Sequence, residues 1–264
     1  MIDQATAFDD TAALLMREHA SGVRYHRLPP ETGVTNLEAA YAVQRRYVDL
    51  MIPAAGAPAG YKIGLTSARM QKMCNIDSPL AGVVLASRVM RSGIALQIGR
   101  YGHLGLEFEV GVRLGRDLRP RETPFTMEEV AKAVDGVCAG VEVVDDRNAD
   151  YKVLEALSLI ADNAWNAGIV LGEFTANWGN LESACGVMQV NGKEADRGYG
   201  RDALGHPFVP LTWLANHLAA SGGGLKAGDI VMTGSIVPTR FPTEPCSYRF
   251  DLSGVGSVEL SVTV

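Results

Sequence analysis

The chain has 264 residues, 30 of them acidic and 24 basic, which leaves a formal net charge of −6 at pH 7. The 47% of hydrophobic and 20% of charged residues are typical of a globular protein. The acidic balance argues against a nucleic-acid partner, because phosphate binding needs clustered Lys and Arg. No run approaches the roughly 18 apolar residues of a membrane span, which argues against a membrane partner as well.

The four cysteines favour an intracellular protein with free thiols. Cys74, Cys138, Cys185 and Cys246 are scattered and form no CxxC pair, which fits neither a zinc site nor a disulfide scaffold. The amino terminus shows no basic segment followed by an apolar one, so we expect no secretory signal. We therefore expect the protein to be cytoplasmic.

The amino-terminal part predicts helices. The first 50 residues read as helical, and Thr35 followed by Glu38 fits a capping box that begins a helix. The stretch 53–58 has proline at both ends and predicts a short connector. Residues 1–60 are therefore expected to form a helical segment ahead of a second part, 61–264, within one compact unit.

From Tyr61 onward the pattern changes to short apolar stretches separated by glycine. The clearest predicted strand is 106–114, in which apolar residues alternate without a break with Glu107, Glu109, Gly111 and Arg113. Further stretches that predict strands are 63–65, 82–85, 94–96, 141–144, 169–171, 230–232 and 258–264.

Fewer helices are expected in this second part. Thr126 and Glu129 form a capping box, and apolar residues at helical spacing extend the predicted helix to Val137. The stretches 151–160 and 211–221 also predict helices, the second ended by three glycines. Because no regular long helices separate the strands, the pattern predicts an α+β or mostly-β fold and not a doubly wound sheet.

Two glutamates on the clearest strand are the first candidates for chemistry. Glu107 and Glu109 lie two residues apart, so they share a strand face with backbones about 6.6 Å apart. Their carboxylates can converge on a hard cation, which prefers oxygen ligands. The alternative is a solvated strand face, as expected for Glu259.

Glu142 is the third carboxylate of interest because valines flank it closely in 141–144. A buried carboxylate without a partner is costly, so it should be paired or bound to a metal. A salt bridge to an arginine such as Arg147 is one possibility. The other is a set of three carboxylates around Mg²⁺, which leaves coordination positions for a substrate.

Lys62 stands in an otherwise apolar, strand-like stretch before a turn of small residues. Its side chain either reaches the surface or points into a cleft, where it can stabilise an oxyanion or move a proton. His103 and His206 have no partner at metal-ligand spacing, which favours structural roles. No GxSxG motif surrounds Ser235, which argues against a serine nucleophile of that type.

Six short motifs follow one another along the chain at 62–67, 106–109, 142–145, 161–164, 204–207 and 233–234. Together they resemble the hydratase/decarboxylase branch of the fumarylacetoacetate hydrolase superfamily. This branch includes 2-hydroxypenta-2,4-dienoate hydratase, 2-oxohept-3-ene-1,7-dioate hydratase and 4-oxalocrotonate decarboxylase. The resemblance extends from about Thr35 to the carboxyl terminus.

The resemblance implies an α+β fold built on a distorted, mostly antiparallel β-barrel-like sheet with flanking helices. It implies a catalytic domain over 61–264 and assembly into a homo-oligomer. It also implies Mg²⁺ or Mn²⁺ held by Glu107, Glu109 and Glu142, with Lys62 as the catalytic lysine. The substrate-binding positions that it suggests are Thr66, Ser67, Leu80, Asp162, Asn163, Thr233 and Ser235.

The implied activity is that of a metal-dependent lyase in the meta-cleavage catabolism of aromatic compounds. Such a hydratase adds water to a 2-hydroxy-2,4-dienoate or 2-oxo-enoate and gives a 4-hydroxy-2-oxo acid. The expected ligand is thus a small anionic 2-oxo or 2-hydroxy acid, which can chelate the cation through its carboxylate and 2-oxygen. The cation would stabilise the enolate, and Lys62 would offset the excess negative charge.

Two positions depart from the pattern of the branch. Leu80 stands where hydratases usually carry an acidic residue that is a candidate for handling water, and decarboxylases also tend to be apolar there. Gly105 replaces a basic residue that often precedes the metal-binding glutamates, whereas the stretch 163–168 looks closer to the hydratases. The alternatives are therefore a decarboxylase of a 2-oxo-dioate, a C–C bond hydrolase of a diketo acid and a non-catalytic binding or scaffold protein.

Overall fold

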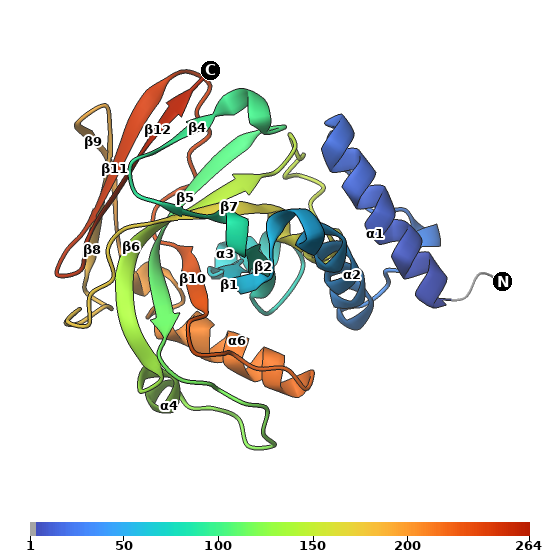
Figure 1. Cartoon of the computed structure of the whole chain (residues 1–264), viewed down its shortest axis with the longest axis horizontal. Coiled ribbons are helices and arrows are strands. Elements are labelled where there is room, and N and C mark those ends of the chain that lie inside the picture. Colours follow the sequence, from blue (N-terminus) through green and yellow to red (C-terminus); the bar gives the residue numbers. More distant parts are fainter. Residues whose placement is uncertain (1–3) are drawn as a thin grey trace.

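The computed structural model describes residues 4–264 and contains two β-sheets with helices packed around them (Figure 1). The α-helices are α1 (Gln4–Ser21), α2 (Leu37–Ala55), α3 (Ala68–Met73), α4 (Met127–Ala131), α5 (Ala156–Ala161) and α6 (Phe208–Ala220). Short 3-10 helices lie at Pro30–Thr32, Ala86–Arg88, Ile98–Arg100, Asn163–Trp165 and Gly200–Asp202. None of the helices within 4–264 combines the length and apolar character that crossing a lipid bilayer requires.

The strands form one sheet of seven and one of five. The seven-stranded order is β2 (Leu80–Leu85), β1 (Pro58–Gly64), β10 (Ile230–Ser235), β5 (Leu104–Leu114), β6 (Val134–Asp145), β7 (Asn166–Leu171) and β3 (Val89–Arg91). The five-stranded order is β4 (Ile94–Gln97), β12 (Gly256–Thr263), β11 (Cys246–Leu252), β8 (Cys185–Val190) and β9 (Lys193–Tyr199).

The structure confirms the α+β class and the helical amino-terminal segment. The strand arrangement is mostly antiparallel, but β1 with β10, β7 with β3 and β12 with β4 pair in parallel. The strands described within 4–264 form two separate sheets with free edges and no closed barrel. In Figure 1 the five-stranded sheet lies on one side of the molecule, and α1 and α2 lie on the opposite side.

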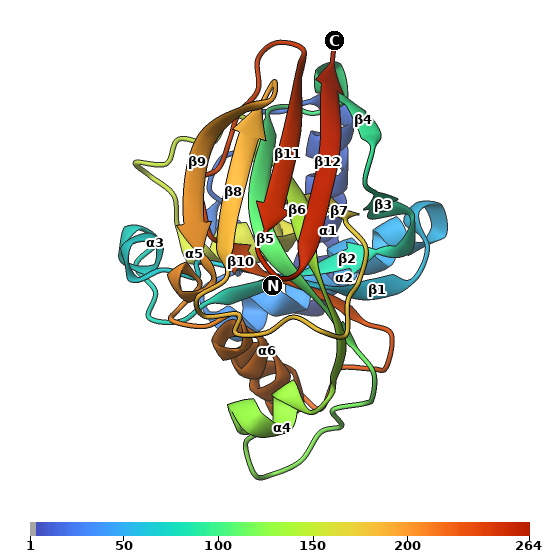
Figure 2. The same cartoon turned by 90° about the vertical axis from the view of Figure 1, so that its left-hand side faces the viewer.

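The alternation in β5 decides what each of its faces contacts. Leu106, Phe108 and Val110 are fully buried in the main core, where Phe108 packs against Tyr248 and Phe250 at ring-centroid distances of 5.7 and 5.6 Å. Figure 2 shows the five-stranded sheet in front of β5 and β6. Because side chains alternate along a strand, the glutamates of β5 point away from this core.

Pairing between β5 and β6 brings the third glutamate to the same place. The two strands are antiparallel, and Glu107 is directly opposite Glu142 in the ladder. Residues opposite each other in such a ladder project from the same face, about 5 Å apart at Cβ. The register therefore gathers glutamates that are 35 residues apart in the sequence.

Two helix starts differ from the sequence prediction. The N-cap of α2 is Asn36 and not Thr35: the Asn36 side chain accepts a hydrogen bond from the Ala39 N–H, and α2 continues through Pro53 to Ala55. The predicted connector over 53–58 was therefore wrong at its start. The helix predicted over 151–160 begins only at Ala156, because the Glu155 carboxylate caps it by accepting bonds from the next turn.

The capping box at Thr126 is confirmed, but the helix after it is shorter than predicted. Helix α4 ends at Ala131, and β6 already begins at Val134. The valines that fit a helical spacing pair with β5 instead, with Val137 opposite Val112. The long ladder with β5 thus overrides the local helical pattern.

Candidate metal centre

Three glutamates come together on the face of the seven-stranded sheet that points away from the main core. One carboxylate oxygen from each of Glu107, Glu109 and Glu142 lies within 4.8 Å of the others. Glu109 and Glu142 are fully buried, while Glu107 is half-buried. The solvated strand face considered as an alternative is therefore wrong for Glu109.

A glycine on β10 lets the backbone approach Glu109. The N–H of Gly234 donates to Glu109 Oε2 at 2.6 Å. Gly234 has a φ of +105°, and a β-carbon there would lie 2.1 Å from Thr66 Oγ1, so only glycine fits. Thr66, one of the predicted substrate-binding residues, is thereby placed beside the carboxylate centre.

The other two glutamates have one hydrogen-bond donor each. Thr239 Oγ1 donates to Glu107 Oε1 at 2.8 Å, and Asn166 Nδ2 donates to Glu142 Oε1 at 3.0 Å. Neither donor was predicted as a site residue. Asn166 lies within the stretch 163–168 that looks closer to the hydratases, whereas nothing in the sequence points to Thr239, since its contact depends on a distant chain segment.

Lys62 points into the protein and not to the surface. Only 4% of the residue is exposed, and Nζ lies 3.1 Å from Glu142 Oε2. The ammonium group therefore forms a buried ion pair with Glu142. A β-carbon at Gly64 would lie 3.0 Å from Leu80 Cδ1 and 3.4 Å from Nζ, so the Leu80 side chain lies beside the ammonium group.

The centre holds more negative than positive charge. Burial raises the pKa of Glu109 well above its ordinary value, and the neighbouring Glu142 and Glu107 raise it further. Burial also raises the pKa of Glu142, although Lys62 opposes this. Burial by itself would lower the pKa of Lys62, but the three carboxylates outweigh it and raise that pKa.

The donor set fits a hard divalent cation. The buried Glu109 Oε1 accepts no hydrogen bond from the described residues, and Glu142 Oε2 has the Lys62 ammonium group as its ion-pair partner. Buried polar atoms of this kind normally have partners, and carboxylate oxygens are the ligands that Mg²⁺ and Mn²⁺ prefer. Three carboxylates against one ammonium leave a formal charge of −2, which one divalent cation neutralises.

The salt bridge from Glu142 to Arg147, one of the two expectations for this carboxylate, is wrong. Arg147 is turned away from the centre, and its guanidinium donates to Asp162 Oδ2 at 2.7 Å and to Glu18 Oε2 at 3.4 Å. Asp162 also faces His19 Nε2 at 2.6 Å. The Asp162 carboxylate, a predicted substrate-binding group, is therefore engaged in a buried ion-pair network with α1.

Other predicted substrate-binding side chains make contacts within the fold. Ser67 is the N-cap of α3, and the Asn163 amide exchanges two hydrogen bonds with the backbone of Val83 at 2.7 and 2.9 Å. The Thr233 hydroxyl donates to Val110 O at 2.9 Å, and that of Ser235 to Val237 O at 2.7 Å. These contacts hold the strands around the carboxylates.

The chain is strained where α5 passes into β7. Asn163, Ala164 and Trp165 have consecutive positive φ values of 49°, 50° and 60°, and non-glycine residues in this region cost about 1–2 kcal/mol each. Strain of this kind clusters at functional sites. Here it precedes Asn166, the donor to Glu142.

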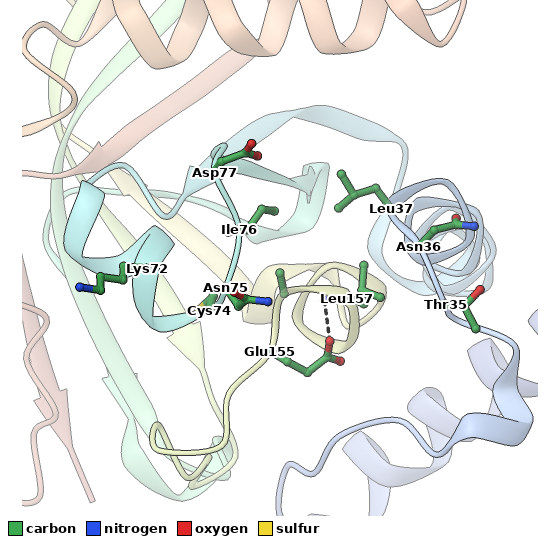
Figure 3. Close-up of a pocket in the computed structure, with 11 residues that line it drawn as sticks. Thr35, Asn36, Leu37, Lys72, Cys74, Asn75, Ile76, Asp77, Glu155 and Leu157 are labelled. Atoms are coloured by element: carbon green, nitrogen blue, oxygen red, sulfur yellow. Dashed lines mark hydrogen bonds between the residues drawn. The ribbon is translucent and has the colours of Figure 1, made fainter.

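A cavity of about 730 Å³ lies outside the centre (Figure 3). It is bounded by the start of α2, the end of α3 and the start of α5, and neither Lys62 nor any of the three glutamates lines it. Cys74 lines this cavity and packs in the apolar cluster of Leu80 and Trp165. The cavity is thus bordered by this apolar cluster and not by the carboxylates.

Comparison with protein families and curated relatives gives a consistent result. The fumarylacetoacetate (FAA) hydrolase C-terminal family model matches residues 62–263. The 2-keto-4-pentenoate hydratase 1 of Dechloromonas aromatica (strain RCB) is 32% identical over 94% of both chains. The 2-hydroxyhexa-2,4-dienoate hydratase of Comamonas testosteroni is 31% identical over 86% of both.

Solved structures show the same fold. The 4-oxalocrotonate decarboxylase from Pseudomonas putida G7, complexed with magnesium and adipate, superposes with a TM-score of 0.87 over 99% of both chains. At 24% sequence identity this likeness concerns the fold.

The raised pKa values predict how pH affects stability. In the metal-free folded protein, the raised pKa values let Glu109 and Glu142 keep their protons at pH values above 4.5, the ordinary glutamate pKa. The unfolded chain has already released these protons at such pH values. The free energy of unfolding of the metal-free protein should then fall as pH rises through this range. A cation needs ionised carboxylates, so its stabilisation should grow with pH.

Thermal unfolding between about pH 5.5 and 8, with EDTA or with Mg²⁺, measures this effect. The difference in Tm between the two conditions should widen as the pH rises. A difference that stays constant or narrows would contradict the assignment of the carboxylates as ligands.

The network around Asp162 predicts a structural role for this residue. Asp162→Asn removes the charge that faces the buried Arg147 guanidinium, which should lower the free energy of unfolding by on the order of 3 kcal/mol. Mg²⁺ affinity at the carboxylates should stay within twofold to threefold of the wild-type value. Chemical denaturation and calorimetry measure the two effects, and a large loss of Mg²⁺ affinity with unchanged stability would overturn this role.

Proposed function

The chain belongs to the fumarylacetoacetate hydrolase family, and on this premise we propose that it is a divalent-metal-dependent lyase. The proposed reaction is the addition of water to a small 2-hydroxy-2,4-dienoate or 2-oxo-enoate, which gives a 4-hydroxy-2-oxo acid in aromatic meta-cleavage catabolism. The observation that carries the proposal is the convergence of three carboxylates, with the buried Glu109 Oε1 accepting no hydrogen bond from the described residues and a buried lysine beside Glu142. The hydratase names of the relatives support the same reaction.

Glu107, Glu109 and Glu142 are the residues that would hold Mg²⁺ or Mn²⁺. When bound, such a cation supplies Lewis-acid stabilisation of negative charge on an enolate oxygen. The Gly234 N–H, Thr239 and Asn166 each orient one of the three carboxylates, and such supporting contacts tune ligand geometry.

Lys62 is the proposed catalytic cation. Because the neighbouring carboxylates raise its pKa, the ammonium group stays charged at neutral pH and enters the reaction as an electrostatic partner and proton donor, not as a base. It can offset the charge of an anionic substrate. It can also donate a proton to the dienol carbon and take up the proton that leaves the 2-hydroxyl group, so that the substrate becomes the 2-oxo form and the lysine is again an ammonium group. The apolar Leu80 side chain and Nζ both lie close to Gly64, so this side of the ammonium group has an apolar neighbour.

A decarboxylase of a 2-oxo-dioate is the second candidate. Leu80 is 1% exposed and apolar, so position 80 supplies no group that can take a proton from water. Loss of carbon dioxide passes through the same enolate and needs no attacking water. The apolar side chain at position 80 therefore favours decarboxylation, whereas the names of the sequence relatives favour hydration.

We also propose that residues 61–264 form the catalytic unit, because every proposed ligand lies there, and that α1 and α2 cover it. Assembly into a homo-oligomer remains a prediction from the family resemblance. The four cysteines are free, which supports the proposed cytoplasmic location, where thiols stay reduced.

Glu109→Gln tests the ligand role with little change in volume. We expect Mg²⁺ affinity and metal-dependent turnover to fall by at least about 100-fold, since removal of even a supporting contact of a metal ligand costs about 10–100-fold. Glu259→Gln is the matched control, because the Glu259 side chain is exposed on β12 and pairs with Arg249. Calorimetry, circular dichroism and an assay with added Mg²⁺ provide the readouts, and near-wild-type activity of folded Glu109→Gln would remove the metal role.

Leu80→Asp separates the two candidate reactions. A carboxylate beside Lys62 can accept a proton from water, so hydration should increase at least several-fold relative to release of carbon dioxide. Leu80→Asn, which is polar but cannot ionise at this pH, is the control. A panel of 2-hydroxydienoates and oxo-dioates, followed by ultraviolet loss and gas release, gives the ratio; an unchanged ratio would show that position 80 does not decide the outcome.

A further inference from the structure

A short segment after β10 extends the glutamate face beyond Glu107. The Leu106 N–H donates to Arg240 O at 2.8 Å, and the Arg240 N–H donates to Leu106 O at 2.9 Å. Because side chains alternate, the residues on either side of Arg240 lie on the face of Glu107. Thr239 accordingly bonds to Glu107, and Phe241 Cε1 would lie 3.1 Å from a β-carbon at Gly105.

Phe241 therefore lies next to Glu107 on this face and covers Gly105, which has no side chain. Its ring stacks on His103 with centroids 4.7 Å apart and an interplanar angle of 5°. The Tyr151 ring lies 6.5 Å away at 72°, and Tyr151 in turn meets Trp165 at 5.9 Å. Phe241 is nevertheless 36% exposed, so part of the ring is available to a ligand.

The polar groups around this aromatic wall are acidic or already paired. Asp146 accepts from Tyr151 Oη at 2.9 Å and faces His103 Nδ1 at 2.7 Å. Within 102–107, 145–151 and 239–241, both guanidinium groups are engaged in ion pairs: Arg147 with Asp162 and Glu18, and Arg240 with Asp196. A second carboxylate on a ligand would meet negative charge here and no free guanidinium group of these segments.

We propose that Phe241, with Tyr151, forms a subsite for the hydrocarbon tail of the substrate and makes the protein selective for monocarboxylic 2-oxo or 2-hydroxy acids over dioates. The proposal rests on the proposed function, which places the acid head at the three glutamates. The head and the tail then lie along one strand face, with Lys62 near the head and Phe241 at the exposed end.

Binding of saturated 2-oxo acids tests the subsite without turnover, since these acids have no double bond to hydrate. Calorimetry on Mg²⁺-loaded protein compares 2-oxobutanoate, 2-oxopentanoate, 2-oxohexanoate and 2-oxohexanedioate. Each added methylene should tighten Kd by up to about fourfold, the equivalent of one buried CH₂. The dioate should bind at least about tenfold more weakly than 2-oxohexanoate, because its tail carboxylate would lose hydration against the Phe241 and Tyr151 rings without gaining a free guanidinium group there.

Phe241→Ala should remove the dependence of Kd on tail length and leave the Kd of 2-oxobutanoate within about twofold of the wild-type value. Phe241→Leu should keep most of the dependence of Kd on tail length. Phe174→Ala is the matched control: this half-buried ring packs on Arg113 at 4.8 Å, at the other end of β5. It should leave the dependence on tail length unchanged.

Three results would overturn the subsite: equal loss of affinity for all chain lengths in Phe241→Ala, dioate binding as tight as that of 2-oxohexanoate, or no 2-oxo acid binding at all. Turnover of 2-hydroxydienoates is measured separately. Tail-dependent binding without turnover keeps the subsite and removes the hydratase function. Turnover without any dependence of binding on tail length keeps the hydratase function and removes the subsite.

Discussion

The gathering of three carboxylates, two of them fully buried, beside one ammonium group is the constraint on which the rest of the site depends. Glu109 and Glu142 are fully buried, and Lys62 is the cation that pairs with Glu142. Unpaired buried charge is costly enough that a protein normally protonates it or pairs it. Here each carboxylate accepts a hydrogen bond from a neighbouring Gly, Thr or Asn, Glu142 also pairs with Lys62, and Glu109 Oε1 has no partner among the described residues. That balance suits an oxygen-seeking divalent cation and an anionic ligand that chelates it.

The sheet produces this arrangement through ordinary strand geometry. Alternation along β5 sends Phe108 into the core and Glu107 and Glu109 to the opposite face, and antiparallel pairing adds Glu142 from β6. At Gly234 the backbone comes close enough for its N–H to donate to Glu109, and a residue with a side chain would clash there with Thr66. The same face continues past Glu107 to Phe241, which links the head of the site to its tail subsite.

Much of the fold could be predicted from local sequence patterns. The wrong predictions share one cause, which is pairing between strands that are distant in the sequence. The unbroken alternation of 106–114 and the capping box at Thr126 are short-range patterns, and the structure confirms both. The stretch 134–137 reads as helix because valines also fit a helical spacing, yet pairing with β5 makes it strand. The partner of Glu142 could not be read from the sequence either. Lys62 is 80 residues away and Arg147 only five, but the order of strands in the sheet decides the pairing.

The position of a bound ion tests the central claim most directly. Crystals grown with Mn²⁺ should show a single strong anomalous peak within the triangle of Glu107, Glu109 and Glu142, with Glu109 Oε1 and Glu142 Oε2 among its ligands. The Lys62 ammonium group should remain beside Glu142 and make no contact with the ion. A peak elsewhere, or the three carboxylates pointing apart without an ion between them, would contradict the account.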